Sequence, residues 1–258
     1  MDDLSESQKK AFNHYINGEN VFITGPGGTG KSYFIKKVYE NAKSRGLNVS
    51  VTAMTGCAAL LLDCNAKTIH SWGSIGLGTD PIEIIIKRIV KYRKRESWIN
   101  TDLLIIDEVS MLSCELFELL YKIAQEFRHN KKPFGNMQII FSGDFHQLPP
   151  VSKDSKFCFE SPIWNECFKN KIILIENFRQ KGDNIYQKIL NEIREGNISQ
   201  ESKDILRKCL NKNKNEQISP TLLYPVKRLA EQVNLFENIS LEGEEKVYKM
   251  KYIETPSK

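Results

Sequence analysis

The residues whose types and spacing best suit binding or catalysis lie in the run GPGGTGKS, residues 25–32. The run follows the pattern G-x-x-x-x-G-K-[S/T] between an apolar run and a helical pattern, as a phosphate-binding loop requires. Glycines lack Cβ atoms, so backbone N–H groups can surround phosphates closely, and the start of the helix adds partial positive charge. Lys31 would reach the β- and γ-phosphates, and the Ser32 hydroxyl would bind Mg²⁺. The predicted nucleotide-binding residues are Gly25, Pro26, Gly27, Gly28, Thr29, Gly30, Lys31 and Ser32.

Two acidic residues, Asp107 and Glu108, close the apolar run LLIID at residues 103–107. An aspartate at the end of a buried strand can hold Mg²⁺ through water, as the partner of a phosphate loop. The adjacent glutamate is suited to activate an attacking water as general base. A kinase has no need of that base, and the guanine-binding pattern N-K-x-D is absent, so the pair favours ATP hydrolysis over a kinase or a GTPase switch. The alternative is that the pair caps the next helix.

A third group of polar residues follows the apolar run QIIFS, residues 138–142, in the sequence GDFHQLPPV. If this run lies beside LLIID in a sheet, Gln147 would face the γ-phosphate and hydrogen-bond to it or to the attacking water. Pro149 and Pro150 would stiffen the exit from the strand, so that a small displacement is transmitted. We expect a sensor of the nucleotide state here; the alternative is an ordinary turn ended by prolines.

Apolar runs alternate with helical patterns along the chain, which predicts an α/β fold with a parallel sheet. Near residue 172 the pattern changes, and we place a boundary there between a first domain, 1–172, and a shorter second domain, 173–258. We expect strands at 21–24, 49–53, 103–107, 138–142, 171–176 and 221–226, helices at 32–46, 111–128, within 184–210 and at 227–238, and a loop at 211–217.

Composition limits the classes of function. The net charge of +5 is compatible with a polyanionic partner but too small to establish one. Six cysteines form no C-x-x-C pair and four histidines are scattered, which argues against structural zinc and indicates a reducing compartment. No apolar run approaches the about 20 residues that span a bilayer, and the start is unlike a signal peptide. We expect an intracellular, soluble protein, nuclear or cytoplasmic, with no membrane partner.

The run KRIVKYRKR, residues 87–95, carries six basic residues in nine positions. It is either a solvated helix face or loop, or else a patch that contacts phosphates or directs nuclear import.

With these motifs the chain resembles the Pif/RecD-like DNA helicases, of the 5′-to-3′ branch of superfamily 1. The resemblance covers nearly the whole chain. It includes the phosphate loop, the acidic pair and the stretch that ends in GDFHQLPPV, with His146 where the family usually has phenylalanine. Four further segments match family motifs: LSESQKKAF (4–12), TAMTGCAALLL (52–62), TIHSWGSIGLG (68–78) and NFRQ (177–180).

The resemblance assigns roles to residues in these segments. Gln8 would read adenine, or would be a surface glutamine at a helix start. Arg179 would contact the γ-phosphate from across a domain cleft, or form a structural salt bridge. The residues that would border single-stranded DNA are Thr55, Gly56, His70 and Trp72. The alternative for His70 and Trp72 is that they are core or capping residues.

The resemblance implies a RecA-like P-loop NTPase domain followed by part of a second RecA-like domain. ATP and Mg²⁺ would be bound, and the partners would be single-stranded and tailed duplex DNA, together with replication or repair proteins. Nothing after residue 180 resembles the family's last two motifs. The chain would therefore be a fragment, a motor that has lost parts, or one that a partner completes. We expect a 5′-to-3′ helicase motor; the alternative is an ATP-gated single-strand-binding ATPase that cannot unwind alone.

Overall fold

The structure is a computed structural model that describes residues 3–151, 154–210, 221–243 and 246–249. The chain divides into two compact units, Met1–Arg207 and Lys208–Lys258. Within the described residues no helix is long and apolar enough to cross a membrane.

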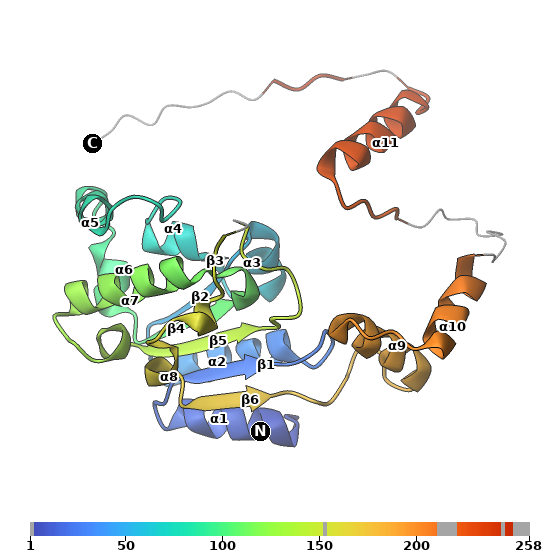
Figure 1. Cartoon of the computed structure of the whole chain (residues 1–258). Coiled ribbons are helices and arrows are strands. Elements are labelled where there is room, and N and C mark those ends of the chain that lie inside the picture. The colour runs from blue at the N-terminus through green and yellow to red at the C-terminus, as the bar shows by residue number, and fades with distance from the viewer. Residues whose placement is uncertain (1–2, 152–153, 211–220, 244–245, 250–258) are drawn as a thin grey trace. The chain divides into compact units, whose positions relative to one another are not determined.

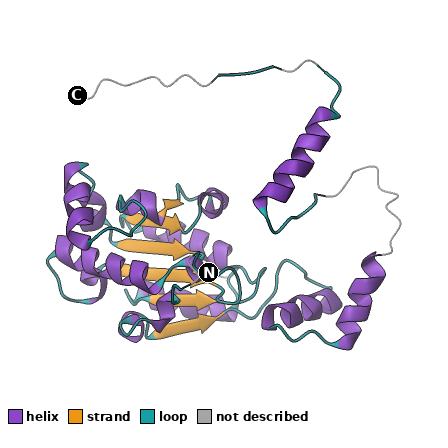
Figure 2. Cartoon of the chain, turned by 45° about the horizontal axis from the view of Figure 1, so that its top comes forward, coloured by secondary structure: helices purple, strands orange, loops and turns teal. Residues whose placement is uncertain are grey.

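The first unit is built around a six-stranded sheet in which every paired strand runs parallel to its neighbour (Figures 1 and 2). The strand order is β3-β2-β4-β5-β1-β6, so β1 and β4 flank β5 at the centre. The predicted α/β fold with a parallel sheet is therefore confirmed. The strands are β1 (Val21–Thr24), β2 (Val49–Ala53), β3 (Lys67–Thr68), β4 (Leu103–Asp107), β5 (Gln138–Gly143) and β6 (Asn170–Ile173).

Helices cover both faces of the sheet, and each face has its own apolar core. In β4, Leu103 and Ile105 pack on one face while Leu104 and Ile106 pack on the other, because successive side chains of a strand point in opposite directions. The face that receives Leu103 is covered by α1 (Glu6–Ile16), α2 (Lys31–Ser44) and α3 (Gly56–Leu62). The opposite face is covered by α4 (Ile69–Gly73), α5 (Ile82–Lys91), α6 (Arg95–Asn100), α7 (Cys114–Arg128) and α8 (Trp164–Cys167).

Several helices begin at a side chain that accepts a hydrogen bond from an otherwise unpaired N–H group. Thr55 caps α3, Ser113 caps α7, and Asp183 caps α9 (Asn184–Glu195). At the start of α1, Ser5 and Gln8 form a reciprocal capping box. These caps fix where each helix leaves the ends of the strands, which is where the site lies.

The helical pattern over 184–210 forms two helices, α9 and α10 (Gln200–Leu210). Gly196 ends α9 in the left-handed conformation (φ 74°), which a glycine adopts without steric cost. The loop predicted at 211–217 lies outside the described residues. The predicted boundary between residues 172 and 173 stays a prediction.

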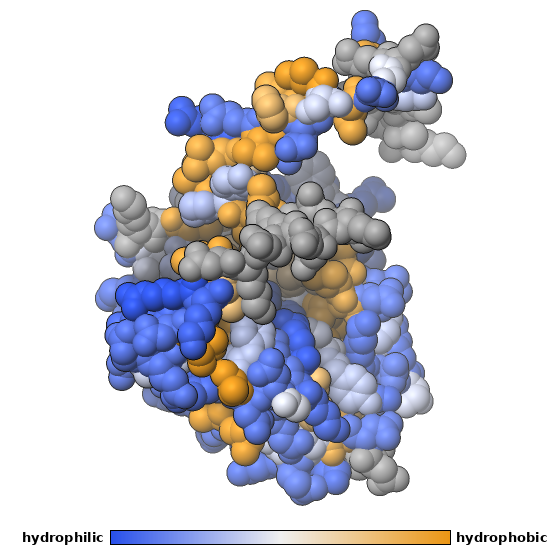
Figure 3. Space-filling view, turned by 90° about the vertical axis from the view of Figure 1, so that its right-hand side faces the viewer, coloured by the Kyte–Doolittle hydropathy of each residue, from blue (hydrophilic) through white to orange (hydrophobic). Residues whose placement is uncertain are grey.

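The strand predicted at 221–226 is wrong: those residues form no strand. The apolar run TLLYPV finds no neighbouring strand among the described residues to pair with, and Leu223 is 92% exposed. The second unit instead contains α11 (Lys227–Ile239), which buries none of its residues. Its apolar residues Leu235, Phe236 and Ile239 are exposed. Figure 3 shows hydrophobic residues at the surface of the chain among hydrophilic ones.

Candidate functional site

The phosphate loop leads from the end of β1 at Thr24 to the start of α2 at Lys31, and the space around Gly25 and Gly28 leaves no room for a side chain. A Cβ on Gly25 would lie 2.4 Å from the carbonyl oxygen of Leu174. One on Gly28 would lie 2.8 Å from the Cβ of Arg179. Both glycines have positive φ angles, 151° and 88°. Glycine at these two positions therefore allows the backbone path of the loop and its close packing against Leu174 and Arg179.

Lys31 is the first residue of α2, and its ammonium group is turned onto the backbone of the phosphate loop. Its Nζ donates hydrogen bonds to the carbonyl oxygens of Gly25, at 2.7 Å, and Pro26, at 3.0 Å. Burial lowers the pKa of Lys31, and the nearby charges of Asp144, Asp107 and Glu108 oppose that shift. Lys31 therefore lies close to the carboxylates of Asp144, Asp107 and Glu108, and the charge of Arg194 adds to the lowering of its pKa.

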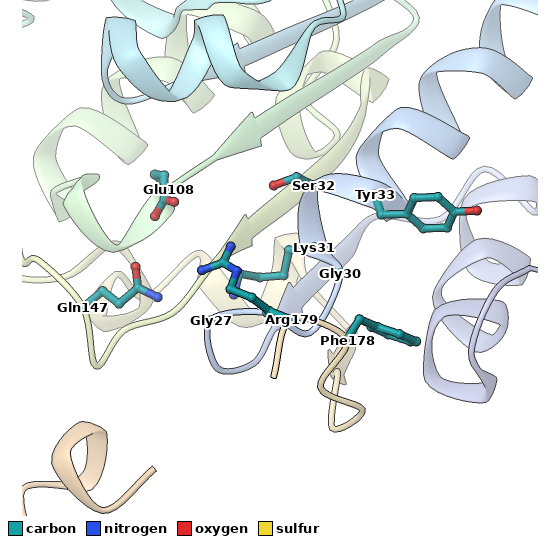
Figure 4. Close-up of a pocket in the computed structure, with 10 residues that line it drawn as sticks. Gly27, Gly30, Lys31, Ser32, Tyr33, Glu108, Gln147, Phe178 and Arg179 are labelled. Atoms are coloured by element: carbon teal, nitrogen blue, oxygen red, sulfur yellow. The ribbon is translucent and has the colours of Figure 1, made fainter. Parts of the chain in front are cut away.

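A cavity of about 390 Å³ opens over this loop and brings together residues from four separate segments (Figure 4). In Figure 4, Glu108 and Gln147 lie to one side, Tyr33 and Phe178 to the other, and Lys31 and Arg179 between them. The cavity volume falls within the usual range for small-ligand sites. The lining residues are Gly27, Gly28, Gly30, Lys31, Ser32, Tyr33, Glu108, Gln147, Phe178 and Arg179.

The acidic pair lies at the end of β4, as expected. Asp107 is 5% exposed, and Glu108 has a left-handed backbone (φ 57°), which is uncommon for a residue other than glycine. Burial raises the pKa of Asp107, and burial together with the charge of Asp107 raises the pKa of Glu108. A glutamate with a raised pKa is a stronger base, so Glu108 is suited to accept a proton inside the cavity.

The residues present fit a magnesium ion that arrives with a nucleotide. In the part of the chain that the structure describes, no three His, Cys, Asp or Glu residues are grouped to hold a metal. Ser32 lines the cavity, and Asp107 makes no ion pair with any described residue. Mg²⁺ is commonly held by one or two protein oxygens completed by phosphates and water, and this site offers that donor set.

Gln8 is buried, at 1% exposed, so the alternative of a surface glutamine is wrong. Its Oε1 accepts a hydrogen bond from the backbone N–H of Ser5, and its Nε2 donates one to the carbonyl oxygen of Gly30, at 3.2 Å. Both ends of the amide therefore join the start of α1 to the phosphate loop. Recognition of adenine by Gln8 stays a prediction.

The loop that carries Arg179 packs directly on the phosphate loop. The backbone N–H of Phe178 donates to the carbonyl oxygen of Gly28, at 2.8 Å. Arg179 is exposed and lines the cavity, and it forms no ion pair with another described residue. Its guanidinium group is therefore available to a phosphate on this side of the cavity.

The residues predicted to border DNA are not among those that line the cavity. Thr55 caps α3 by accepting from the N–H of Ala58, and Gly56 is exposed beside it. Trp72 is 8% exposed and packs on Trp98 with ring centroids 4.7 Å apart, as the core alternative requires. His70 is half-buried, and burial lowers its pKa. Contact of these four residues with DNA stays a prediction.

Sequence reasoning missed an ion pair between Asp144, which follows β5, and Arg194 on α9. It also missed Tyr33 and Phe178 in the lining of the cavity. The signal for the ion pair was an acidic residue directly after a buried strand, which needs a partner. The partner is 50 residues away in the sequence, and no local pattern identifies it.

The basic run at 87–95 spans the end of α5 and the start of α6, and most of it is exposed. Arg88 pairs with Asp80, and residues 90–95 face solvent. This matches a solvated helix face; contact with phosphates stays a prediction.

The sequence of this chain is similar to those of known helicases. A sequence model described as PIF1-like helicase matches residues 3–204. The chain is 40% identical over 255 residues to the ATP-dependent DNA helicase PIF1 of Saccharomyces cerevisiae, covering 95% of this chain and 29% of that protein. It is 36% identical over 201 residues to human PIF1, covering 77% of this chain and 31% of that protein. The chain thus spans about a third of the length of these relatives.

Solved structures agree. The crystal structure of Pif1 helicase from Candida albicans superimposes with a TM-score of 0.86 at 35% identity, covering 93% of this chain and 55% of that one. A Bacteroides Pif1 helicase in complex with ADP-AlF3 and single-stranded DNA superimposes with a TM-score of 0.78 at 28% identity, covering 97% and 61%. The first unit therefore has the RecA-like architecture that the sequence predicted.

Proposed function

The chain belongs to the PIF1-like helicase family, and on that premise we propose that it hydrolyses ATP and couples hydrolysis to movement on single-stranded DNA. The single observation that carries the proposal is the cavity over the phosphate loop. Residues from four segments, predicted separately for ATP hydrolysis, line this one space. If these segments were only turns and helix caps, they would have no reason to line the same cavity.

Each residue has a role that its position supports. The backbone of residues 25–30 and the ammonium group of Lys31 bind the phosphates. Glu108 accepts a proton from the attacking water, and its raised pKa suits that task. Arg179 stabilises charge that develops on the γ-phosphate, a contribution that in comparable enzymes is worth roughly 10³–10⁵ in rate. Gln147 contacts the γ-phosphate or the attacking water, and so detects hydrolysis.

The metal would be held by Ser32 and Asp107, and when bound it would supply positive charge that neutralises the phosphates.

The nucleic-acid partner is proposed from the relatives. They are named as ATP-dependent DNA helicases; one solved structure is a complex with single-stranded DNA, and another is described as the basis for DNA unwinding at forked duplex DNA. We propose single-stranded and tailed duplex DNA as partners, 5′-to-3′ movement, and roles in DNA repair, recombination, replication or telomere maintenance alongside replication or repair proteins. Thr55, Gly56 and His70 are the proposed contacts, together with Trp72 if its ring becomes accessible.

A second candidate function is an ATP-gated single-strand-binding ATPase that does not unwind alone. It requires only the nucleotide cavity and the proposed single-strand contacts, which lie within the matched residues 3–204. Strand displacement from a 5′-tailed duplex separates the two functions, because the binding module would hydrolyse ATP without releasing the strand.

The test of the site is Lys31→Ala. Loss of the only lysine that lines the cavity among the described residues should abolish DNA-stimulated ATP hydrolysis while the protein stays folded. The matched control is Lys36→Ala, on the same helix but outside the cavity, which should keep the wild-type rate. Undiminished hydrolysis in Lys31→Ala refutes the site.

The test of the partner is the salt dependence of single-strand binding. Phosphate contacts release counterions, so affinity should fall steeply and linearly on a log–log plot as salt rises. An affinity that does not change with salt concentration would contradict the proposal that nucleic acid is the partner.

A further inference from the structure

The ion pair between Asp144 and Arg194 differs from the other ion pairs of the described residues in its burial. The Asp144 side chain is 1% exposed and that of Arg194 is 22% exposed. In each of the other pairs, both side chains are at least 18% exposed. A buried carboxylate is costly unless it is paired and hydrogen-bonded, so this pair holds two segments in a defined relation.

The geometry of the pair fixes orientation as well as distance. Arg194 donates from Nε to Oδ2 and from Nη2 to Oδ1 of Asp144, both at 2.8 Å. Two parallel charge-assisted hydrogen bonds lock the plane of the carboxylate to the plane of the guanidinium group. Burial alone would raise the pKa of Asp144, but the hydrogen bonds from Arg194 hold it below its ordinary value.

The same carboxylate organises the turn that carries Gln147. Asp144 Oδ1 accepts from the backbone N–H of His146, at 3.2 Å, and Oδ2 accepts from Nε2 of Gln147, at 3.4 Å. The backbone N–H of Gln147 donates to the carbonyl oxygen of Asp144, at 2.8 Å. One residue therefore joins Arg194 to a side chain that lines the cavity.

The helix that carries Arg194 also contacts the opposite side of the cavity. At the start of α9, Gln187 Nε2 donates to the carbonyl oxygen of Gln180, at 2.6 Å, and the N–H of Asp183 donates to the same oxygen. Gln180 is the neighbour of Arg179. The start of α9 thus holds the loop of Arg179, and its end holds the turn of Gln147.

We propose that Arg194 is a positioning residue for recognition of the γ-phosphate: acting through Asp144, it sets Gln147 relative to Arg179 across the cavity. The inference rests on the proposed function, because the two positioned residues are those assigned to the γ-phosphate. Among the described residues, Arg194 donates its side-chain hydrogen bonds to Asp144, and its charge also lowers the pKa of Lys31 in the cavity.

The experiment compares Arg194→Gln with wild type in two measurements. Displacing a reacting or sensing group by about 1 Å can cost about 10²-fold in rate, so kcat for ATP at saturating single-stranded DNA should fall about 10- to 100-fold, with KM changed less than about 3-fold. The preference for a non-hydrolysable ATP analogue over ADP, measured as the ratio of dissociation constants, should fall about 10-fold.

A double-mutant cycle with Gln147→Ala tests whether Arg194 acts through the glutamine. In the Gln147→Ala background, Arg194→Gln should lower kcat by less than about 3-fold further, because coupled residues are not additive. The matched control is Arg207→Gln, which removes another Arg–Asp pair outside the cavity lining and should leave kcat and the nucleotide preference unchanged.

The outcomes separate the inference from the proposed function. Wild-type kcat and nucleotide preference in folded Arg194→Gln overturn the inference, as do fully multiplicative effects with Gln147→Ala. If the wild-type chain binds nucleotide but does not hydrolyse it, kcat cannot be compared. The inference then stands or falls on whether Arg194→Gln lowers the preference for the ATP analogue over ADP. If it binds none, the proposed function fails, and the inference fails with it. If Arg194→Gln does not fold, Arg194→Lys, which keeps the charge but not the two parallel bonds, is measured in its place.

Discussion

The carboxyl ends of the neighbouring strands β4 and β5 have similar sequences but different chemistry. Each strand is a buried apolar run followed by an aspartate, and Asp107 and Asp144 are 5% and 1% exposed. Burial raises the pKa of Asp107. Burial opposes ionisation of Asp144 too, but the hydrogen bonds from Arg194 outweigh it and the pKa of Asp144 is lowered.

The difference shows that an arginine partner determines whether a buried carboxylate can bind a ligand or instead holds the surrounding backbone in place. Among the described residues no arginine forms an ion pair with Asp107 or Glu108; hydrogen bonds from Ser142 and from the backbone of Glu108 reach Asp107, and Glu108 lines the cavity. At the end of β5 the oxygens of Asp144 are occupied by Arg194, His146 and Gln147, so the carboxylate orders a turn. On the proposed function, the carboxylates at the end of β4 take part in ATP hydrolysis, and Asp144 after β5 positions Gln147.

The largest effect expected is that of Glu108→Gln at the end of β4. An amide cannot accept the proton of the attacking water, so kcat should fall about 10²- to 10⁴-fold while nucleotide affinity is retained. Steady-state ATP hydrolysis with single-stranded DNA and binding of a fluorescent nucleotide measure the two quantities. Glu115→Gln, an exposed residue of α7, is the control. A wild-type rate of ATP hydrolysis in Glu108→Gln would show that Glu108 is not the general base.

The same substitution at the two aspartates should affect the free energy of unfolding differently. Asp144→Asn leaves the guanidinium group of Arg194 without its anion and should lower the free energy of unfolding by about 3 kcal/mol. Asp107→Asn removes a buried charge whose pKa is raised, and without Mg²⁺ or nucleotide it should not lower stability at pH 7. Urea unfolding of both variants gives the comparison; equal losses would show that the two strand ends are alike.

A smaller effect is expected from Arg194→Lys. Lysine keeps the positive charge but cannot form two parallel hydrogen bonds, so we expect a loss of about 2 kcal/mol, the value of one hydrogen bond to a charged group. Arg207→Lys, in an exposed pair with Asp204, should change stability by less than about 0.5 kcal/mol. If Arg194→Lys is as stable as wild type, charge alone holds the end of β5 and the fork geometry is unimportant.

The smallest effect is the pH dependence of the Asp144 contribution. Arg194, Lys31 and Glu108 face this carboxyl, and its folded-state pKa lies below the ordinary value of 3.8. A lowered pKa gives stability that is present above the ordinary value and is lost as pH falls through the folded value.

The stability gap between wild type and Asp144→Asn should therefore be constant between about pH 7 and 5 and narrow below about pH 3.8. Urea unfolding across this range measures it. A gap that widens on acidification would mean that Asp144 is not held ionised by its partner.

Local sequence predicted the features that depend on neighbouring residues. The glycines of residues 25–32 and the strands at 21–24, 49–53 and 103–107 follow from backbone freedom and apolar runs, and the structure contains them. The run at 221–226 shows the limit of this reasoning. An apolar run forms a strand only where another strand pairs with it, and among the described residues none does.

The sequence by itself determined the phosphate loop, the acidic end of β4 and the parallel α/β fold, because each depends on residue types at short spacing. Only the tertiary structure decided that Gln8 is buried against Gly30, that Trp72 packs on Trp98, and that Asp144 pairs with Arg194. These pairs are separated by 22 or more residues, and their contact depends on how the strands are ordered in the sheet and where each helix returns. Residue type gives a buried carboxylate its need for a partner, but the path of the chain decides which arginine meets it.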